Sequence, residues 1–482
     1  MPPSSEASAP AGEITFTDFH NIINGELKTT AKTRHTLNPA TGEPNLEVPV
    51  STQQDLDEAV SAARIAQKSW AKTTFEERRA ALQAYANALA PHREQFISLL
   101  ISEQGKPSWL ADDEFTRTLR IIKVTSEFEL AEEVLQDTDD SLEYPLVLGM
   151  GKMAAAVCAG NAIIMKPSPD TPYTGLKYVE LANQFFPPGV VQALSGAHDL
   201  GPMCTAHPGI DKISFTGSIA TGKKVMESCA KTLKRVTLEL GGNDAAIVCE
   251  DVEVKKIVPK IGILCFLNSG QICMDIKRLY VHSSIYDSFL TALIAYAKTL
   301  KVGPGTSPDT FIGPVQNEIQ YARVNSFLED ITPNGQNIVL GGKNAEVNGT
   351  TVPKKGYFIP PTIISSPPDS SLIVREEPFG PIVPILAWTD ESDVISRGNG
   401  TRFGLGASVW TADLDRGKRM ARQLEAGSTW VNMHFHLDPG VPFGGLKESG
   451  VGREWGLVGL KGWCEVKSEW IGKGAVGREV GT

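Results

Sequence analysis

The chain has 482 residues, of which 41% are hydrophobic and 21% charged, so it is too long for one compact core and predicts two or three globular domains. A formal charge of -10 at pH 7 argues against a nucleic-acid or anionic-membrane surface, because it supplies no net attraction for polyphosphate. Seven cysteines without a CxxC spacing are typical of a reducing compartment, so we expect a cytoplasmic protein without a disulfide framework or zinc cluster.

The first thirteen residues are polar, rich in Pro, Ser and Ala, and contain no basic residue. This composition is unlike a secretory or transit peptide and predicts a disordered lead. The longest apolar run, 153–165, is interrupted by Gly160 and Asn161 and is short of the roughly 20 residues that a membrane span requires. We therefore predict no membrane span.

Two helices are predicted next. Ser51 and Gln54 match a capping box before an Ala-rich stretch, which predicts a helix over 56–70. A second helical pattern begins at Phe75, with Leu82, Tyr85 and Leu89 on one face, until Pro91 interrupts it. We expect both helices to cover a core and to carry no chemistry.

From residue 162 onward, short β-rich runs alternate with helical patterns, which predicts a doubly wound parallel sheet. The strand-like runs are 162–165, 190–194, 212–216, 236–240 and 244–248. Helices are predicted around 176–186 and from Ile219, the latter with Val225, Cys229 and Leu233 on one face.

A second block, 252–446, repeats this mixture of helices and strands. It contains a strand near 430–432 and a helix whose apolar residues share one face. Those residues are Ile285, Phe289, Leu293, Tyr296 and Leu300. Gly-rich joints at 241–242 and 303–305 mark turns or domain boundaries.

Two features of the first block suit a nucleotide. Residues 211–222 predict a strand that runs through Gly217 into a helix, whose N-terminus presents N–H groups to a pyrophosphate. A tight connection without a ligand explains this segment equally well. Lys166 directly follows a predicted strand, where parallel sheets bind ligands, although a surface lysine is the simpler interpretation of that residue alone.

A nucleophile and a base are predicted by two further segments. Glu239 is a charged residue within an apolar strand pattern, which is costly unless the carboxylate is paired or functional. Cys273 follows a glycine turn at Gly270, where a thiol is open to activation. Each residue alone has a structural explanation, but the two segments together are specific.

Taken with these segments, the sequence resembles the aldehyde dehydrogenases from about residue 20 to residue 470. The matching motifs are FTGS at 215–218, LELGG at 238–242, NSGQIC at 268–273, EEPFGP at 376–381 and PFGG at 442–445. The resemblance implies an α/β fold with a Rossmann-type parallel-sheet cofactor domain, an α/β catalytic domain and a small oligomerisation arm.

The resemblance also implies domain limits. They are a lead over 1–13, an NAD(P)-binding domain over 14–120 and 142–241, and a truncated oligomerisation arm over 121–141. A catalytic domain over 242–446 and a C-terminal return and tail over 447–482 complete the chain. Family members form homodimers or homotetramers, and a shortened arm weakens that expectation here.

By the same resemblance, Cys273 attacks an aldehyde, a hydride passes to NAD or NADP, and Glu239 activates the water that hydrolyses the resulting thioester. Lys152 and Glu454 match a proton-relay pair. The positions that match cofactor-binding residues are Lys166, Ser168, Gly217, Ser218, Gly222, Leu240, Glu377 and Phe379. Pro169 stands where many members have a glutamate that repels a 2′-phosphate, so the choice between NAD and NADP stays open.

Tyr144 and Phe443 match substrate-tunnel residues, as do Leu148 and Gly151. A glycine at 151, where some members have a bulky aromatic residue, suggests a wide tunnel. The sequence does not identify the aldehyde.

Two patterns are weighed and set aside. His434, His436 and Asp438 have the i, i+2, i+4 spacing of metal ligands on one strand face, but a loop at the tunnel mouth is the better interpretation, and we predict no metal site. A G-x-G-x-x-G pattern at Gly472, Gly474 and Gly477 lies too near the end of the sequence for a βαβ unit, so we treat it as chance.

The sequence departs from the family pattern before Tyr144. Family members have a strand that leads into Trp-Asn-Phe/Tyr-Pro, and this asparagine donates to the oxyanion. Here the strand is missing and Leu142 and Glu143 replace Trp-Asn. Loss of one oxyanion donor typically lowers turnover on the order of 10²–10³-fold. A carboxylate at 143 that pointed inward would also repel the thiolate and the alkoxide.

We therefore expect an aldehyde dehydrogenase whose turnover is impaired in this form, as a splice or gene-model variant. One alternative is a non-catalytic member that binds nucleotide or a partner chain without turnover. A second alternative keeps the nucleophile and loses hydride transfer, which leaves esterase activity only.

Overall fold

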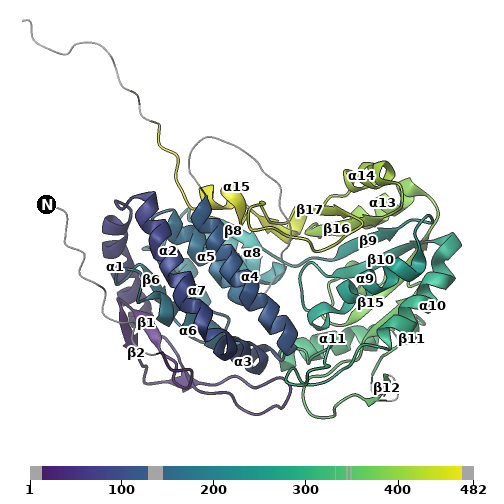
Figure 1. Ribbon diagram of the computed structural model, residues 1–482, viewed down its shortest axis with the longest axis horizontal. Coiled ribbons are helices and arrows are strands. Elements are labelled where there is room, and N and C mark those ends of the chain that lie inside the picture. Colours follow the sequence, from purple (N-terminus) through teal and green to yellow (C-terminus); the bar gives the residue numbers. More distant parts are fainter. Residues whose placement is uncertain are drawn as a thin grey trace, which may run out of the picture.

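The computed structural model describes residues 14–128, 145–331, 333–343, 346–347, 350–468 and 470. Figure 1 shows two lobes: helices of the N-terminal part gather on one side, and a large sheet flanked by α10 (Tyr286–Ala297), α13 (Glu391–Asn399) and α14 (Leu414–Ala421) lies on the other. None of the helices that the structure describes is long and apolar enough to cross a membrane.

The two predicted N-terminal helices are confirmed. The first, α1 (Gln53–Trp70), is capped by Thr52, which exchanges hydrogen bonds with Asp55. The predicted pair of Ser51 and Gln54 was therefore wrong by one position, because Ser51 is buried and bonds to the Ser195 carbonyl instead. The second helix, α2 (Phe75–Leu89), buries the predicted apolar face.

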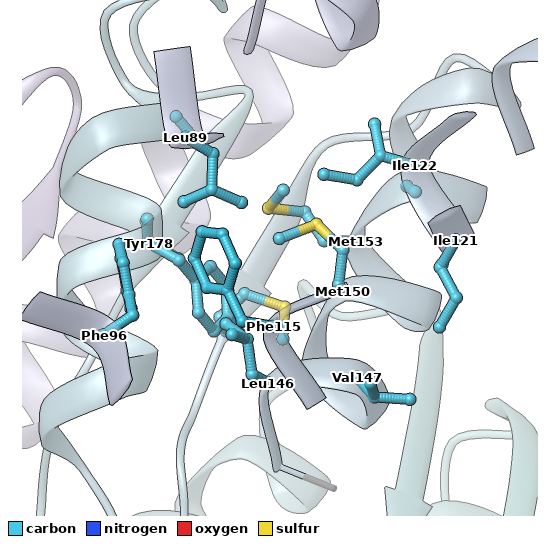
Figure 2. Close-up of a cluster of buried hydrophobic side chains, with 14 of the residues drawn as sticks. Leu89, Phe96, Phe115, Ile121, Ile122, Leu146, Val147, Met150, Met153 and Tyr178 are labelled. Carbon is cyan, nitrogen blue, oxygen red and sulfur yellow. The ribbon is translucent and has the colours of Figure 1, made fainter. Parts of the chain in front are cut away.

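A helical core holds the N-terminal lobe together. It is built from α2, α3 (Arg93–Gln104), α4 (Ser108–Glu127), α5 (Pro145–Cys158) and α6 (Tyr173–Ala182). Figure 2 shows Phe115 of α4 among Leu146, Met150 and Met153 of α5. Residues 121–127 of the predicted arm form the end of α4. This packing fixes α5, which carries Lys152.

The part of the chain predicted to bind a nucleotide contains two separate sheets. One has the order β2-β1-β6-β5, made of β1 (Asn21–Ile23), β2 (Glu26–Lys28), β5 (Ile163–Met165) and β6 (Val191–Ala193). The other has the order β18-β8-β7, made of β7 (Lys212–Thr216), β8 (Arg235–Glu239) and β18 (Gly450–Val451). The predicted parallel pairing occurs within each sheet, between β5 and β6 and between β7 and β8.

Within the described residues, β5 pairs only with β6, and β7 pairs only with β8. All residues of β7 are half-buried, whereas β9 (Asp244–Val248) in the other lobe is buried throughout. A parallel strand with helices on both faces is normally buried. β7 is therefore less covered than β9.

The second lobe contains a seven-stranded sheet of order β11-β14-β15-β10-β9-β16-β17. Its other strands are β10 (Ile276–His282), β11 (Asn337–Leu340), β14 (Thr362–Ser365), β15 (Ile382–Trp388), β16 (Gly406–Trp410) and β17 (Ser428–Val431). All neighbours are parallel except β11 and β14. The predicted strand near 430–432 is thus confirmed as β17.

The remaining helices and strands connect or flank these sheets. They are α7 (Leu200–Ala206), α8 (Ile219–Ala230), α9 (Val254–Phe266), α11 (Glu318–Ile331), α12 (Leu372–Arg375), α15 (Gly456–Lys461), β3 (Thr33–Arg34), β4 (Val48–Pro49), β12 (Glu346–Val347) and β13 (Thr350–Thr351). One predicted face was partly wrong: Val225 and Cys229 are buried, but Leu233 is 80% exposed, because α8 ends at Ala230 and the chain turns toward β8.

Candidate active site

The loop that carries Cys273 follows α9 and is held in an unusual backbone conformation. Asn268 and Ser269 have positive φ angles of 49° and 60°, and Gly270 has a φ of 71°. A Cβ on Gly270 would lie 2.1 Å from the Gly380 carbonyl oxygen, so only glycine fits there. The buried Ser269 hydroxyl donates to the Gly313 carbonyl at 2.9 Å and fixes the turn. Such strain is typical of functional sites.

The structure brings Glu239 to Cys273. Glu239 is the last residue of β8, its side chain is buried, and its Oε1 lies 4.0 Å from Cys273 Sγ, which is half-buried. The two residues come from different lobes, and their side chains meet at the carboxyl end of β8. A carboxylate at this distance can reach a water that attacks a group carried by the sulfur.

A chain of polar contacts leads from Glu239 to Lys152 and Glu454. Thr216 donates to Glu239 Oε2 at 3.4 Å and accepts from Lys152 Nζ at 3.0 Å. Lys152 Nζ also donates to Glu454 Oε1 at 2.7 Å. The predicted pair is therefore in contact, and Thr216 connects it to the base.

Sequence reasoning missed two members of this chain. Thr216 lies inside the FTGS motif, of which only the glycine and the serine were interpreted, as cofactor-binding residues. Ser214 donates to Glu454 Oε1 at 2.8 Å. Both hydroxyls are on β7, and their spacing of two residues places them on one face. That spacing was the available signal. In the described part of the chain, Glu454 Oε2 is buried without a hydrogen-bond partner.

Three of the predicted nucleotide residues, Gly217, Ser218 and Gly222, lie at the start of α8. Ser218 is the N-cap of this helix and accepts from Thr221 N, while Gly217 N donates to the Glu239 carbonyl at 3.0 Å. A Cβ on Gly222 would lie 2.6 Å from Leu240 Cδ2, so this glycine lets the helix pack closely on the segment after β8. The helix N-terminus is thereby placed beside the base.

Lys166 and Ser168 lie at the carboxyl end of β5. Burial lowers the pKa of Lys166, whose Nζ donates to the Pro167 carbonyl at 3.0 Å. Ser168 accepts from Asp170 N at 3.2 Å and shapes the turn. A partly desolvated ammonium at a strand end is suited to bind ribose hydroxyls or phosphate.

Glu377 contacts the segment after β8 and the start of β10. Its Oε1 accepts from Gly242 N at 3.2 Å and lies 3.6 Å from Lys277 Nζ. Burial raises the pKa of Glu377, and the Lys277 ammonium opposes that shift. Phe379, two residues later, has a positive φ of 51°.

The wide tunnel expected at Gly151 stays a prediction, and the structure shows which side chain lies against this glycine. Trp455 fills the space above this glycine, because a Cβ on Gly151 would lie 2.6 Å from Trp455 Nε1. The indole is 6% exposed and lies 5.2 Å from the ring of Phe443, centroid to centroid. An aromatic side chain from the C-terminal segment therefore lies against Gly151 of α5. Leu148 is half-buried on α5.

His434, His436 and Asp438 lie in a loop after β17, as predicted, and do not gather around one point. His434 bonds to Ser408 Oγ at 2.9 Å and to the Met274 carbonyl at 2.8 Å, and burial lowers its pKa to about 3. Asp438 pairs with Arg120 at 2.6 Å. Across the described ranges, no group of three or more His, Cys, Asp or Glu could hold a metal ion.

Several predictions fall outside the described residues: the disordered lead over 1–13, the arm beyond residue 128, Leu142 and Glu143 in place of Trp-Asn, Tyr144 as a substrate residue, and the glycine pattern at 472–477.

Comparison with known proteins places this geometry in context. Residues 27–139 and 141–469 match the aldehyde dehydrogenase family. Aldehyde dehydrogenase LUC3 from Fusarium sp. is 39% identical over 471 residues, covering 95% of this chain and 100% of that protein.

Two solved structures are similar over nearly the whole chain. The NAD+ complex of an aldehyde dehydrogenase from Bacillus cereus has a TM-score of 0.88 and 33% identity, covering 95% of this chain and 97% of that one. An NADP-dependent enzyme from E. coli has a TM-score of 0.87 and 32% identity, covering 94% and 98%.

Proposed function

The chain belongs to the aldehyde dehydrogenase family, and from this premise we propose that it oxidises an aldehyde to a carboxylic acid with NAD or NADP. The observation that carries the proposal is the 4.0 Å separation of Cys273 Sγ and Glu239 Oε1, beside a helix N-terminus suited to a pyrophosphate. A nucleophile, a base and a nucleotide site within one region are the parts that this chemistry needs.

The residues around α8 fit a nicotinamide dinucleotide. The N-terminal turn of α8 and the desolvated Lys166 suit phosphate and ribose, and the buried carboxylate of Glu377 suits the hydroxyls of the second ribose. When bound, the cofactor supplies a hydride acceptor. Enzymes with NAD+ and with NADP are both among the similar structures, so the proposal covers both cofactors.

The chain's own residues supply the remaining chemistry. The Cys273 thiolate adds to the aldehyde carbon, and departure of hydride leaves a thioester on Sγ. Glu239 takes a proton from a water that attacks this thioester, which releases the acid and restores the thiolate. The contacts through Thr216 and Lys152 to Glu454 give that proton a route away from the base.

We further propose that turnover is slow in this form. Members of the family use an asparagine amide at the oxyanion, and this chain has Glu143 there by sequence. Among the described residues, β5 and β7 each have one edge without a partner strand, which supports the loss of the strand that should deliver that amide. The second candidate, a nucleotide-binding member without turnover, rests on the same observation.

The test mixes purified protein with NAD or NADP and each of a series of aldehydes, and follows the formation of reduced cofactor by absorbance at 340 nm. The proposal expects slow aldehyde-dependent reduction that disappears in Cys273→Ala. Ordinary enzyme rates would overturn the impairment, and cofactor binding without any turnover would favour the second candidate. Ester hydrolysis without cofactor reduction would favour an esterase.

The assembly and compartment are also proposals. The seven free thiols support a reducing compartment such as the cytoplasm. Family members assemble as dimers or tetramers, and a shortened arm weakens that assembly. Light scattering would distinguish a monomer from an oligomer.

A further inference from the structure

Lys277 is buried directly beneath the nucleophile loop. It is the second residue of β10, and its side chain is 3% exposed. Its ammonium donates to the carbonyl of Ile272 and, at 2.9 Å, to that of Cys273. One cation thus binds two successive carbonyls of the loop. Burying a cation costs much free energy unless hydrogen bonds and a counter-charge offset it.

The charges around Lys277 come from several elements. Glu377, after α12, lies 3.6 Å away, and Asp244 of β9 also acts on the buried site. Burial raises the pKa of Asp244 to about 7, and burial keeps His434 neutral by lowering its pKa. The main counter-charge is therefore Glu377, the carboxylate proposed for the cofactor ribose.

The position of Lys277 sets the direction of the Cys273 backbone N–H. The peptide between Ile272 and Cys273 is trans and planar, so its C=O and N–H point in opposite directions. Because the Ile272 carbonyl points at the Lys277 ammonium, the Cys273 N–H points away from it. The cation also polarises the peptide, which makes this N–H a stronger donor.

We propose that Lys277 is a positioning residue that holds the Cys273 N–H toward the substrate oxygen and ties the nucleophile loop to Glu377. This inference rests on the proposed function. It matters more here than in a complete site, because the amide donor is absent by sequence and the Cys273 N–H is left to stabilise the oxyanion.

The test compares Lys277→Met, which keeps length and apolar volume, with Lys277→Arg, which keeps the charge. Lys177→Met is the matched control, because Lys177 is also buried and paired, with Glu180 at 2.6 Å, but lies in α6. Misplacement of a reacting group by about 1 Å costs on the order of 10²-fold in rate. We expect Lys277→Met to lower kcat by about that factor with little change in the KM for aldehyde.

A second measurement separates this inference from the proposed function. Nitrophenol release from an activated ester needs Cys273 and its N–H but neither cofactor nor hydride transfer. We expect Lys277→Met to slow the burst of nitrophenol about 10-fold or more, Lys277→Arg to restore much of it, and Lys177→Met to leave it unchanged.

A burst within threefold of wild type in Lys277→Met, or an equal loss in Lys177→Met, would overturn the role of Lys277. A wild type that releases nitrophenol but oxidises no aldehyde would overturn the proposed function and leave the role of Lys277 supported.

Discussion

At the scale of single residues, the candidate site is a thiol that faces one carboxylate, and a hydroxyl and an ammonium connect this carboxylate to a second one. Glu239 faces Cys273, and Thr216 joins Glu239 to Lys152 and Glu454. The sequence alone singled out Glu239 and Cys273 by their settings. The Lys152 and Glu454 pair came only from family resemblance, because nothing in their local sequence indicates that they meet.

Glu239→Gln should separate acylation from hydrolysis. Because Glu239 acts on the thioester, the first turnover should still form one equivalent of reduced cofactor, and the later steady rate should fall about 10²–10⁴-fold. Stopped-flow absorbance at 340 nm measures both phases. If the first phase slows as much as the steady rate, Glu239 acts before the thioester and the assignment fails.

Trp455→Ala should widen the proposed substrate tunnel, because the Trp455 indole packs directly against Gly151, a predicted tunnel residue. We expect the ratio of kcat/KM for a bulky aromatic aldehyde over a short alkyl aldehyde to rise about 10-fold or more, in line with the 1–3 kcal/mol that a methylene changes in a pocket. Gly151→Ala crowds the same indole and should lower that ratio. An unchanged ratio in both variants would place Trp455 away from the substrate.

Asp244→Asn should change how stability depends on pH. Burial raises the pKa of Asp244 to about 7 from 3.8, so its contribution to stability is full below pH 3.8 and is lost as the pH rises toward 7. The Asn variant does not titrate and should gain stability relative to wild type across that window. Urea unfolding between pH 4 and 8 measures the difference.

Asp309→Asn is the control for that titration. The Lys301 hydrogen bond lowers the pKa of the exposed Asp309, so its substitution should give no gain in stability between pH 4 and 7. Parallel pH curves for wild type and Asp244→Asn would contradict the assignment.

At the scale of elements, the start of α5 depends on a buried ion pair. Glu114 of α4 pairs with Lys106, and its Oε1 accepts from Leu146 N at 2.7 Å in the first turn of α5. Both side chains are fully buried. This contact holds the start of α5, which directly follows the segment where the sequence departs from the family pattern. The same helix carries Lys152.

Glu114→Ala should destabilise the protein by about 3–5 kcal/mol, because the buried ammonium of Lys106 loses its carboxylate. Asp113→Ala is the neighbouring control: its pair with Arg117 is partly exposed, and its loss should cost less than about 1 kcal/mol. Urea denaturation followed by tryptophan fluorescence compares the two. Equal losses would show that Glu114 does not anchor α5.

Elements were predicted where the local pattern decides them. The buried face of α2 and the strands β5 to β9 follow from periodicity alone. The end of α8 was missed because Leu233 continues the apolar spacing of the helix although the helix has already ended at Ala230. The contact of Trp455 with Gly151 was missed because it joins distant segments, and such contacts leave no local signal.

At the scale of the whole molecule, a base at the end of β8 in one lobe faces a nucleophile in the loop before β10 of the other lobe. The seven-stranded sheet behind Cys273 is continuous, whereas the nucleotide half is divided between β5 and β7 in the described residues. From the sequence we predict that a strand is missing before Tyr144, and this stays a prediction because residues 129–144 lie outside the described ranges. We therefore expect the acylation site to be formed and the oxyanion to be poorly stabilised.

The most direct test of this account is a single-turnover measurement with enzyme in excess of aldehyde and saturating NAD or NADP. The account predicts slow formation of reduced cofactor in proportion to aldehyde, with none in Cys273→Ala. The account would be contradicted if cofactor were still reduced by Cys273→Ala. It would also be contradicted if the wild type bound the cofactor but did not reduce it.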